Sequence, residues 1–378
     1  MSRILFVVPP LVGHINPTVG VAARLTAEGH EVGWVGPTKA LAPLVGKDAA
    51  FYPSRRPLSE VAVVGRPAQL RGFASLKFLW EEFLIPLADG MAPLVDAAVE
   101  EFRPDAMLVD QQALAGALVA ERRGIPFATS ATTSAELVRP LAELPKVAAW
   151  LDELLNGLRE RHGSPEATHD LRFSPHGVLA FSTEELVGPT KGHIVYVGPS
   201  ITQRPDDTPF PELDGRPVVL VSLGTANAEA GEKFLRTAVE ALAELPDYQG
   251  VVVDPTGEVT DVRRVPQLAL LPKCAVVVCH AGHNTVCETL SHGVPLVVAP
   301  IHDDQPIVAQ QVVDAGAGVR VRFGRVTTEQ LTTAITEALG YTEGARRIQR
   351  SFASAGGAEA AANWLSELAA TRTSGAKR

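Results

Sequence analysis

The stretch His280–Glu288, with the sequence HAGHNTVCE, determines the fold class of this chain. It follows the apolar run Ala275–Cys279, which is typical of a strand buried in a parallel sheet. A turn with Gly282 then leads into a helix, so backbone N–H groups and the positive end of a helix dipole are expected at the carboxyl end of the strand. Open α/β sheets bind ligands at this edge, which predicts a phosphate-bearing, nucleotide-type ligand near His280.

Apolar runs typical of strands alternate with helical patterns along all 378 residues. In the first half the runs are Ile4–Val8, Glu31–Val35, Ala106–Val109, Pro126–Thr129 and Val178–Phe181. In the second half they are Val218–Ser222, Val251–Val253, Ala275–Cys279, Leu296–Ala299 and Val319–Arg322. This alternation predicts an α/β protein with a mostly parallel, doubly wound sheet in each half.

The first helix of the chain has signals at both ends. Asn16 suits the N-cap, Pro17 suits the first helical position, and Gly29 follows the last turn. We therefore expect the helix to begin at Pro17.

A proline-rich segment separates the two halves. Its prolines are Pro199, Pro205, Pro209, Pro211 and Pro217. Proline at this density disfavours both helix and central strand. We expect a first domain at 1–199, a linker at 200–216, a second domain at 217–357, and a final helix within 358–378 that packs back on the first domain and ends in a disordered tail from Thr371. Two such domains usually bind their ligand in the cleft between them.

Composition excludes several classes of protein. The formal net charge is −9 without any block of like charges, so no nucleic-acid partner is expected, because neutralising phosphates needs clustered Lys and Arg. No apolar run reaches the length of a transmembrane segment. Three cysteines, an odd number, indicate a reducing compartment. The N-terminus enters the first strand without a signal-peptide pattern, so the expected location is the cytoplasm. A homodimer stays open.

A long set of residues in the second half matches one family signature in order and spacing. They are Val265-Pro266-Gln267, Leu271, His280–Thr285, Glu288, Gly293-Val294-Pro295, Pro300 and Asp304-Gln305. Together they resemble the nucleotide-sugar signature of the UDP-glycosyltransferase family. Gly13–Pro17 and Ser222–Thr225 fit the same family. The resemblance covers nearly the whole chain and is weakest between Gly46 and Met91.

The resemblance implies the GT-B fold, in which two Rossmann-like domains face each other across a cleft. The first domain would bind the acceptor and the second the nucleotide-sugar. The implied activity is that of an inverting, metal-independent glycosyltransferase without a cofactor. Its acceptor would be a small lipophilic natural product, as in bacterial macrolide and other antibiotic biosynthesis. The favoured donor is a UDP-hexose, and a dTDP-deoxysugar stays open because bacterial members often use one.

Transfer of a sugar to a hydroxyl or amine needs a base for the nucleophile. The resemblance implies that His14 is this base and that Asp110 is its carboxylate partner. Both residues follow predicted strands, and a base that becomes cationic is stabilised by an adjacent carboxylate. The alternatives are a packing role for His14 at the entry to a helix, and an N-cap role for Asp110 before the helix predicted at Gln111–Arg123.

The resemblance also implies a set of donor-binding residues. They are Ser222, Thr225, Arg264, Val265, Gln267, His280, Gly282, Asn284, Thr285, Glu288, Asp304 and Gln305. Glu288 would bind the ribose hydroxyls, and Asp304 with Gln305 would bind the hydroxyls of the sugar, although both also suit the N-cap of the helix that begins at Pro306. Arg264 departs from the family, which commonly has an aromatic residue that stacks on the nucleobase. A guanidinium also stacks on a base.

The helical pattern Phe73–Leu87 places several large apolar residues on one face. Core packing is the favoured interpretation. The alternative, which the resemblance implies, is a wall of the acceptor pocket that includes Phe73, Trp80 and Phe83. Thr132 belongs to a second candidate wall.

Other functions remain as alternatives. The cluster Cys274, Cys279, His280, His283, Cys287 and His292 lacks the spacing of a zinc site, so no metal is expected. The first turn has no G-x-G-x-x-G, which disfavours a nicotinamide dinucleotide. A catalytically silent helper protein and a sugar-nucleotide epimerase share the expected fold.

Overall fold

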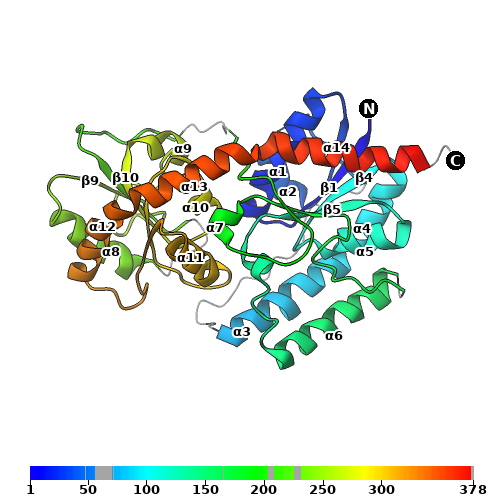
Figure 1. Ribbon diagram of the computed structural model, residues 1–378, viewed down its shortest axis with the longest axis horizontal. Coiled ribbons are helices and arrows are strands. Elements are labelled where there is room, and N and C mark those ends of the chain that lie inside the picture. The colour runs from blue at the N-terminus through cyan, green and yellow to red at the C-terminus, as the bar shows by residue number, and fades with distance from the viewer. Residues whose placement is uncertain are drawn as a thin grey trace. The chain divides into compact units, whose positions relative to one another are not determined.

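The computed structural model describes residues 1–46, 48–55, 70, 72–164, 166–202, 208–224 and 231–375. The chain forms two compact units (Figure 1). Unit 1 comprises Met1–Phe181, Thr190–Thr202 and Ala355–Arg378, and unit 2 comprises Ser182–Pro189 and Gln203–Ser354. The sequence places Ser182–Pro189 in the first domain, but this segment belongs to unit 2, where Leu186 packs into the core. Among the described residues, no helix has both the length and the apolar character needed to cross a membrane.

Unit 1 is built on a seven-stranded sheet with the order β3-β2-β1-β4-β5-β6-β7. The strands are β1 (Arg3–Val7), β2 (Glu31–Val35), β3 (Ala50–Phe51), β4 (Ala106–Asp110), β5 (Phe127–Ala131), β6 (Val178–Ala180) and β7 (Ile194–Tyr196). All pairs are parallel, as the sequence predicts. The sequence misses β3 and β7, which are the short edge strands.

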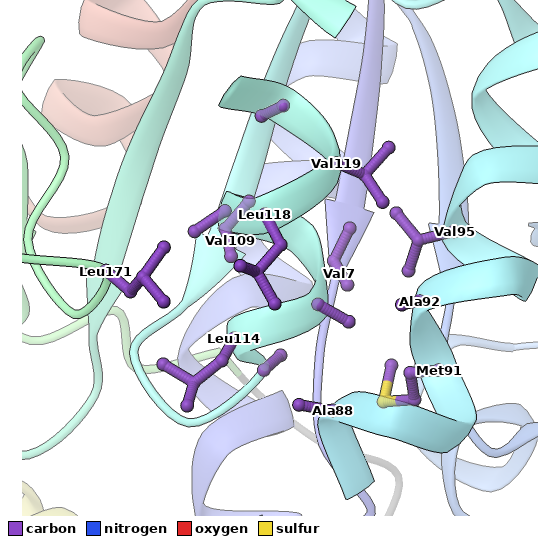
Figure 2. Packing of buried hydrophobic residues seen from close by; sticks show 14 of the residues in the cluster. Val7, Ala88, Met91, Ala92, Val95, Val109, Leu114, Leu118, Val119 and Leu171 are labelled. Carbon is purple, nitrogen blue, oxygen red and sulfur yellow. The ribbon is translucent and has the colours of Figure 1, made fainter. Parts of the chain in front are cut away.

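Helices cover both faces of this sheet. They are α1 (Val12–Ala27), α2 (Thr38–Val45), α3 (Gly72–Lys77), α4 (Ile85–Phe102), α5 (Leu114–Arg123), α6 (Pro145–His162) and α14 (Gly357–Gly375). One core lies against α4, α5 and α6, and Figure 2 shows Val7 of β1 among side chains of α4 and α5 such as Met91 and Leu118. The other core joins Ile4 and Phe6 to α1 and α14. Successive residues of β1 therefore point to opposite cores, as expected of a strand buried on both faces.

The first helix begins one turn earlier than the sequence predicts. It starts at Val12, so Asn16 and Pro17 lie inside it rather than at its cap. Pro17 is the sixth residue of the helix and has no N–H to donate to the carbonyl of Gly13, so the helix lacks one backbone hydrogen bond there. His14 consequently lies in the first turn of the helix.

The apolar segment after residue 71 is longer than predicted. α3 continues through a π-helical segment, Phe78–Leu84, directly into α4. At the other end of the chain, α14 packs along α1 (Figure 1). It extends to Gly375, so the chain is helical where the sequence predicts a disordered tail from Thr371.

Unit 2 contains a five-stranded sheet with the order β12-β11-β10-β8-β9, again with parallel pairs throughout. The strands are β8 (Val218–Ser222), β9 (Gln249–Val252), β10 (Cys274–Cys279), β11 (Leu296–Val298) and β12 (Gly318–Arg320). The helices are α7 (Glu184–Val187), α8 (Glu232–Ala243), α9 (Gln267–Leu270), α10 (His283–Ser291), α11 (Gln305–Asp314), α12 (Thr328–Ala338) and α13 (Thr342–Ala355). Cys279 pairs with Ser222, so the turns that follow β10 and β8 are neighbours.

Candidate functional site

Three side chains of unit 1 meet at the carboxyl edge of its sheet. Nδ1 of His14 lies 2.9 Å from Oδ1 and 3.0 Å from Oδ2 of Asp110. The hydroxyl of Thr132 donates to Oδ2 of Asp110 at 2.9 Å and lies 2.8 Å from Nδ1 of His14. The backbone N–H of Gln112 donates to Oδ1 of Asp110 at 2.9 Å. We call His14, Asp110 and Thr132 the histidine cluster.

The histidine cluster determines which nitrogen of His14 is basic. A carboxylate only accepts hydrogen bonds, so Nδ1 of His14 carries the proton shared with Asp110 and the lone pair is on Nε2. The Asp110 side chain is fully buried, whereas the His14 side chain is 15% exposed. A buried carboxylate that orients a more accessible imidazole is the arrangement of a general base.

The sequence identifies His14 and Asp110 but assigns Thr132 to an acceptor wall. The strand register explains why Thr132 joins them. Asp110 of β4 pairs with Ser130 of β5, and Thr132 is two residues further on, on the same face of the sheet. Consecutive strands are often neighbours, and that is the one signal in the sequence that could have placed Thr132 beside Asp110.

In unit 2, the turn after β10 has an unusual backbone. Ala281 is fully buried and has a left-handed φ of 64°, although it carries a Cβ. Such strained residues concentrate at functional sites. Gly282 is the N-cap of α10 and has no side chain with which to cap the helix. The N-terminus of α10 therefore presents the backbone N–H groups of its first turn, and the side chains of Asn284 and Thr285 belong to the same turn. These N–H groups and the helix dipole favour binding of an anion.

His280 lies at the end of β10, beside Gly224 and Gly282. Burial lowers the pKa of His280 to about 4, and the charge of nearby Asp304 opposes this shift. The imidazole is therefore neutral at neutral pH and offers a hydrogen bond rather than a positive charge.

Two donor-side residues predicted from the sequence are in direct contact. Nε2 of Gln267 donates to Oε2 of Glu288 at 2.6 Å. Glu288 is buried in α10, where its carboxylate is held in one orientation by this bond. Val265 packs against the core of unit 2, whereas Arg264 is exposed.

The turn between β11 and α11 has a second left-handed residue, Asp303, with a φ of 55°. Oε1 of Gln305 accepts from the backbone N–H groups of Ile301 at 2.9 Å and His302 at 3.1 Å. This amide oxygen therefore stabilises the turn itself. Asp304 is the N-cap residue of α11, but its side chain makes no capping hydrogen bond.

The remaining predicted residues are divided. Ser222 ends β8, next to Cys279, and Thr225 lies outside the described residues. Trp80 and Phe83 are buried in the core of unit 1, so core packing, the favoured interpretation, describes them better than an acceptor wall. Phe73 is 53% exposed.

Within the described ranges, no group of three or more His, Cys, Asp and Glu side chains could hold a metal ion. Burial raises the pKa of both Cys274 and Cys279 to about 12, so these side chains are thiols rather than thiolates at neutral pH.

Comparison with known proteins identifies the family of the chain. The family model described as UDP-glucoronosyl and UDP-glucosyl transferase matches residues 214–345. The chain is 30% identical over 392 residues to 4'-demethylrebeccamycin synthase from Lentzea aerocolonigenes, covering 89% of this chain and 92% of that protein.

Solved structures agree over almost the whole chain. The glycosyltransferase of kitacinnamycin has a TM-score of 0.79 at 26% identity and covers 97% of this chain and 99% of its own. The glycosyltransferase VinC, in complex with dTDP, has a TM-score of 0.73 at 21% identity and covers 98% of this chain and 100% of its own. The fold is therefore of the GT-B type, and the chain belongs to the UDP-glycosyltransferase family of bacterial natural-product glycosyltransferases.

Proposed function

We propose that the protein is an inverting glycosyltransferase that moves a hexose from a nucleoside diphosphate to a hydroxyl or amine of a small lipophilic acceptor. The histidine cluster is the observation that carries this proposal, because it supplies a base whose tautomer and orientation are fixed by Asp110 and Thr132. Relatives named for rebeccamycin and kitacinnamycin support a natural-product acceptor and a role in antibiotic biosynthesis.

The proposed reaction is a single displacement at the anomeric carbon. Nε2 of His14 takes the proton from the acceptor O–H or N–H as the new bond to the anomeric carbon forms. The bond from that carbon to the β-phosphate oxygen breaks, and the nucleoside diphosphate leaves with the electron pair. Attack opposite the leaving group inverts the anomeric configuration.

The leaving diphosphate would be stabilised without a metal. The N-terminus of α10 and the neutral imidazole of His280 offer hydrogen-bond donors to the developing charge. Glu288, oriented by Gln267, would accept hydrogen bonds from the ribose hydroxyls. UDP-hexose is the favoured donor, and the dTDP complex of VinC keeps a dTDP-sugar as the alternative.

Thermal unfolding tests the donor class directly. Wild-type protein is heated with UDP, dTDP, GDP or NAD, each with and without EDTA, because a ligand of the folded state raises the unfolding midpoint. We expect UDP or dTDP to raise it equally with and without EDTA, and NAD to leave it unchanged. No response to UDP or dTDP would contradict a nucleotide-sugar enzyme, and a rise that EDTA abolishes would contradict metal independence.

The stereochemical outcome needs a separate measurement. With the donor chosen by the unfolding experiment and an acceptor found in a library screen, the coupling constant of the anomeric proton in the product is read by NMR. An α-linked donor should give a β-linked product. An α-linked product would overturn the single displacement.

A further inference from the structure

The imidazole of His280 is enclosed by two glycines from different parts of the chain. A Cβ built on Gly224, just after β8, would lie 2.8 Å from Cε1 of His280. A Cβ built on Gly282 would lie 2.4 Å from Nε2 and 2.8 Å from Cε1 of the same ring. Real Cβ atoms are not found this close to ring atoms, so neither position accepts a side chain unless the ring moves. We call Gly224 and Gly282 the glycine slot.

Backbone conformation does not explain both glycines. Gly224 has a left-handed φ of 71°, which by itself favours glycine. Gly282 has a φ of −63°, which any residue can adopt. At Gly282, therefore, the contact with His280 is the reason that a side chain is excluded.

The slot also leaves part of the ring without a protein partner. Among the described residues, Nδ1 of His280 is buried and has no hydrogen-bond partner. A buried polar atom without a partner is costly, and such atoms are rare in folded proteins. Because Nδ1 is enclosed by protein, a hydrogen bond to a ligand would be made by Nε2, the ring nitrogen that lies beside Gly282.

We propose that Gly224 and Gly282 are positioning residues that fix the imidazole of His280 for hydrogen bonding to the diphosphate of the donor. This inference rests on the proposed function, because it assumes a nucleoside diphosphate at the N-terminus of α10. The slot acts in two ways: it prevents rotation of the ring, and the missing side chain of Gly282 leaves space beside Nε2 for a phosphate oxygen. An oxygen that accepts from an N–H lies about 2.9 Å away, in space that a methyl group on Gly282 would occupy.

The neutral state of His280 agrees with this role. Because burial lowers the pKa of His280 to about 4, the ring does not attract the diphosphate by charge. Its contribution then depends on the direction of one N–H bond, which is sensitive to small rotations of the ring. A fixed ring is therefore worth more here than a mobile one.

The test measures the Kd of UDP, or of dTDP if that nucleotide binds wild-type protein more tightly, by isothermal titration calorimetry. The variants are Gly224→Ala, Gly282→Ala, His280→Ala, and each glycine variant combined with His280→Ala. Gly316→Ala is the matched control for Gly224→Ala, since Gly316 has a φ of 60° but nothing within 4 Å of a built Cβ. Gly340→Ala is the control for Gly282→Ala, because its built Cβ also has no neighbour within 4 Å and its φ is not left-handed.

We expect each single variant of the slot to raise Kd about 10-fold, as His280→Ala does, and the controls to leave Kd unchanged. In the His280→Ala background, the glycine substitutions should add less than about 2-fold, because residues that act through one ring are not additive. Equal effects of the glycine substitutions with and without His280 would overturn the proposal. So would wild-type affinity in both glycine variants.

Folding failure is also informative. If Gly224→Ala or Gly282→Ala lowers the unfolding midpoint sharply, removing the ring should restore it, because the clash is with the imidazole. A double variant that stays as unstable as the single one would show that backbone strain, not the slot, requires the glycine. If wild-type protein binds neither UDP nor dTDP, the proposed function is contradicted. Failure of the glycine slot alone gives a different result, because wild-type protein then still binds the nucleotide.

Discussion

Nδ1 of His14 lies 2.9 Å from Oδ1 of Asp110, although the two residues are 96 positions apart in the sequence. The contact arises because β1 and β4 are adjacent parallel strands, so that the turns after them lie at the same edge of the sheet. His14 reaches this edge from the first turn of α1, and Asp110 is the last residue of β4. A fixed imidazole beside a buried carboxylate follows directly from this topology.

Substitution of the Asp110 carboxylate should slow the transfer reaction without changing the binding of the donor. Asp110→Asn keeps the shape of the side chain but presents an amide that no longer selects the Nδ1–H tautomer of His14. By analogy with the same change in serine protease triads, we expect kcat to fall about 10³–10⁴-fold. The rise in unfolding midpoint caused by UDP should equal that of wild type. Transfer at more than a tenth of the wild-type rate would contradict the assigned role.

Thr132 should contribute less than Asp110. Thr132→Val removes the hydroxyl that donates to Asp110 and lies beside Nδ1 of His14, while Thr132→Ser retains it. Loss of one hydrogen bond to a charged group costs about 1.5–3 kcal/mol, so we expect roughly a 10- to 100-fold fall in kcat for Thr132→Val. If Thr132→Ser is as impaired as Thr132→Val, the hydroxyl is not the active group.

Substitution of Glu288, which Gln267 contacts, distinguishes the proposed ribose contact from the proposed diphosphate contact. Glu288→Gln keeps the size of the side chain but weakens its acceptor strength. We expect the Kd of UDP to rise about 10-fold, which corresponds to about 1.4 kcal/mol. The affinity for inorganic pyrophosphate, which has no ribose, should be unchanged. An unchanged Kd for UDP would exclude the ribose role, and an equal loss for pyrophosphate would indicate a general disturbance of the site.

The pKa of His280 predicts a specific dependence of stability on pH. Burial lowers this pKa from the ordinary value of 6.5 to about 4. The charge of Asp304 raises the pKa and that of His302 lowers it, and both effects are smaller than that of burial. The unfolded chain therefore takes up a proton below pH 6.5 that the folded protein refuses. The stabilising contribution is complete above pH 6.5 and is lost as the pH falls to 4, with a loss of about 2 kcal/mol already at pH 5.

His280→Asn removes this dependence. The difference in unfolding midpoint between wild type and His280→Asn is measured at pH 7.5 and at pH 5.0. We expect wild type to lose more stability on acidification than the variant. Parallel losses in the two proteins would mean that His280 is readily protonated in the folded state.

The sequence predicts the central parts of the fold better than its edges. The runs that became β1, β4, β8 and β10 are continuous and apolar, since these strands are buried on both faces. β3 and β7 are short edge strands whose residues carry no such pattern, so only the neighbouring strand defines them. The predicted start of α1 was wrong. Proline usually marks the first turn of a helix, but here Pro17 lies in the second turn of a helix that has already begun at Val12.

For the candidate site, the sequence indicates which polar residues follow strands but not which of their side chains are in contact. His14, Asp110 and His280 are recognisable from their positions after strands. The place of Thr132 depends on strand order and register, and that of Gly224 depends on the neighbouring ends of β8 and β10. Binding of the sugar by Gln305 stays a prediction, and the structure adds that its amide oxygen accepts from two N–H groups of its own turn, a contact that no sequence pattern indicates.

His14→Ala tests the central claim most directly. Transfer from the donor to the acceptor is measured for wild type and His14→Ala at equal enzyme concentration, together with the UDP- or dTDP-induced rise in the unfolding midpoint of each. If His14 is the base, transfer falls at least about 10³-fold while the midpoint rise is unchanged, because the proposed nucleotide site is formed by residues of unit 2. Transfer that survives in His14→Ala with normal nucleotide binding would contradict the assignment of the base and, with it, the proposed mechanism.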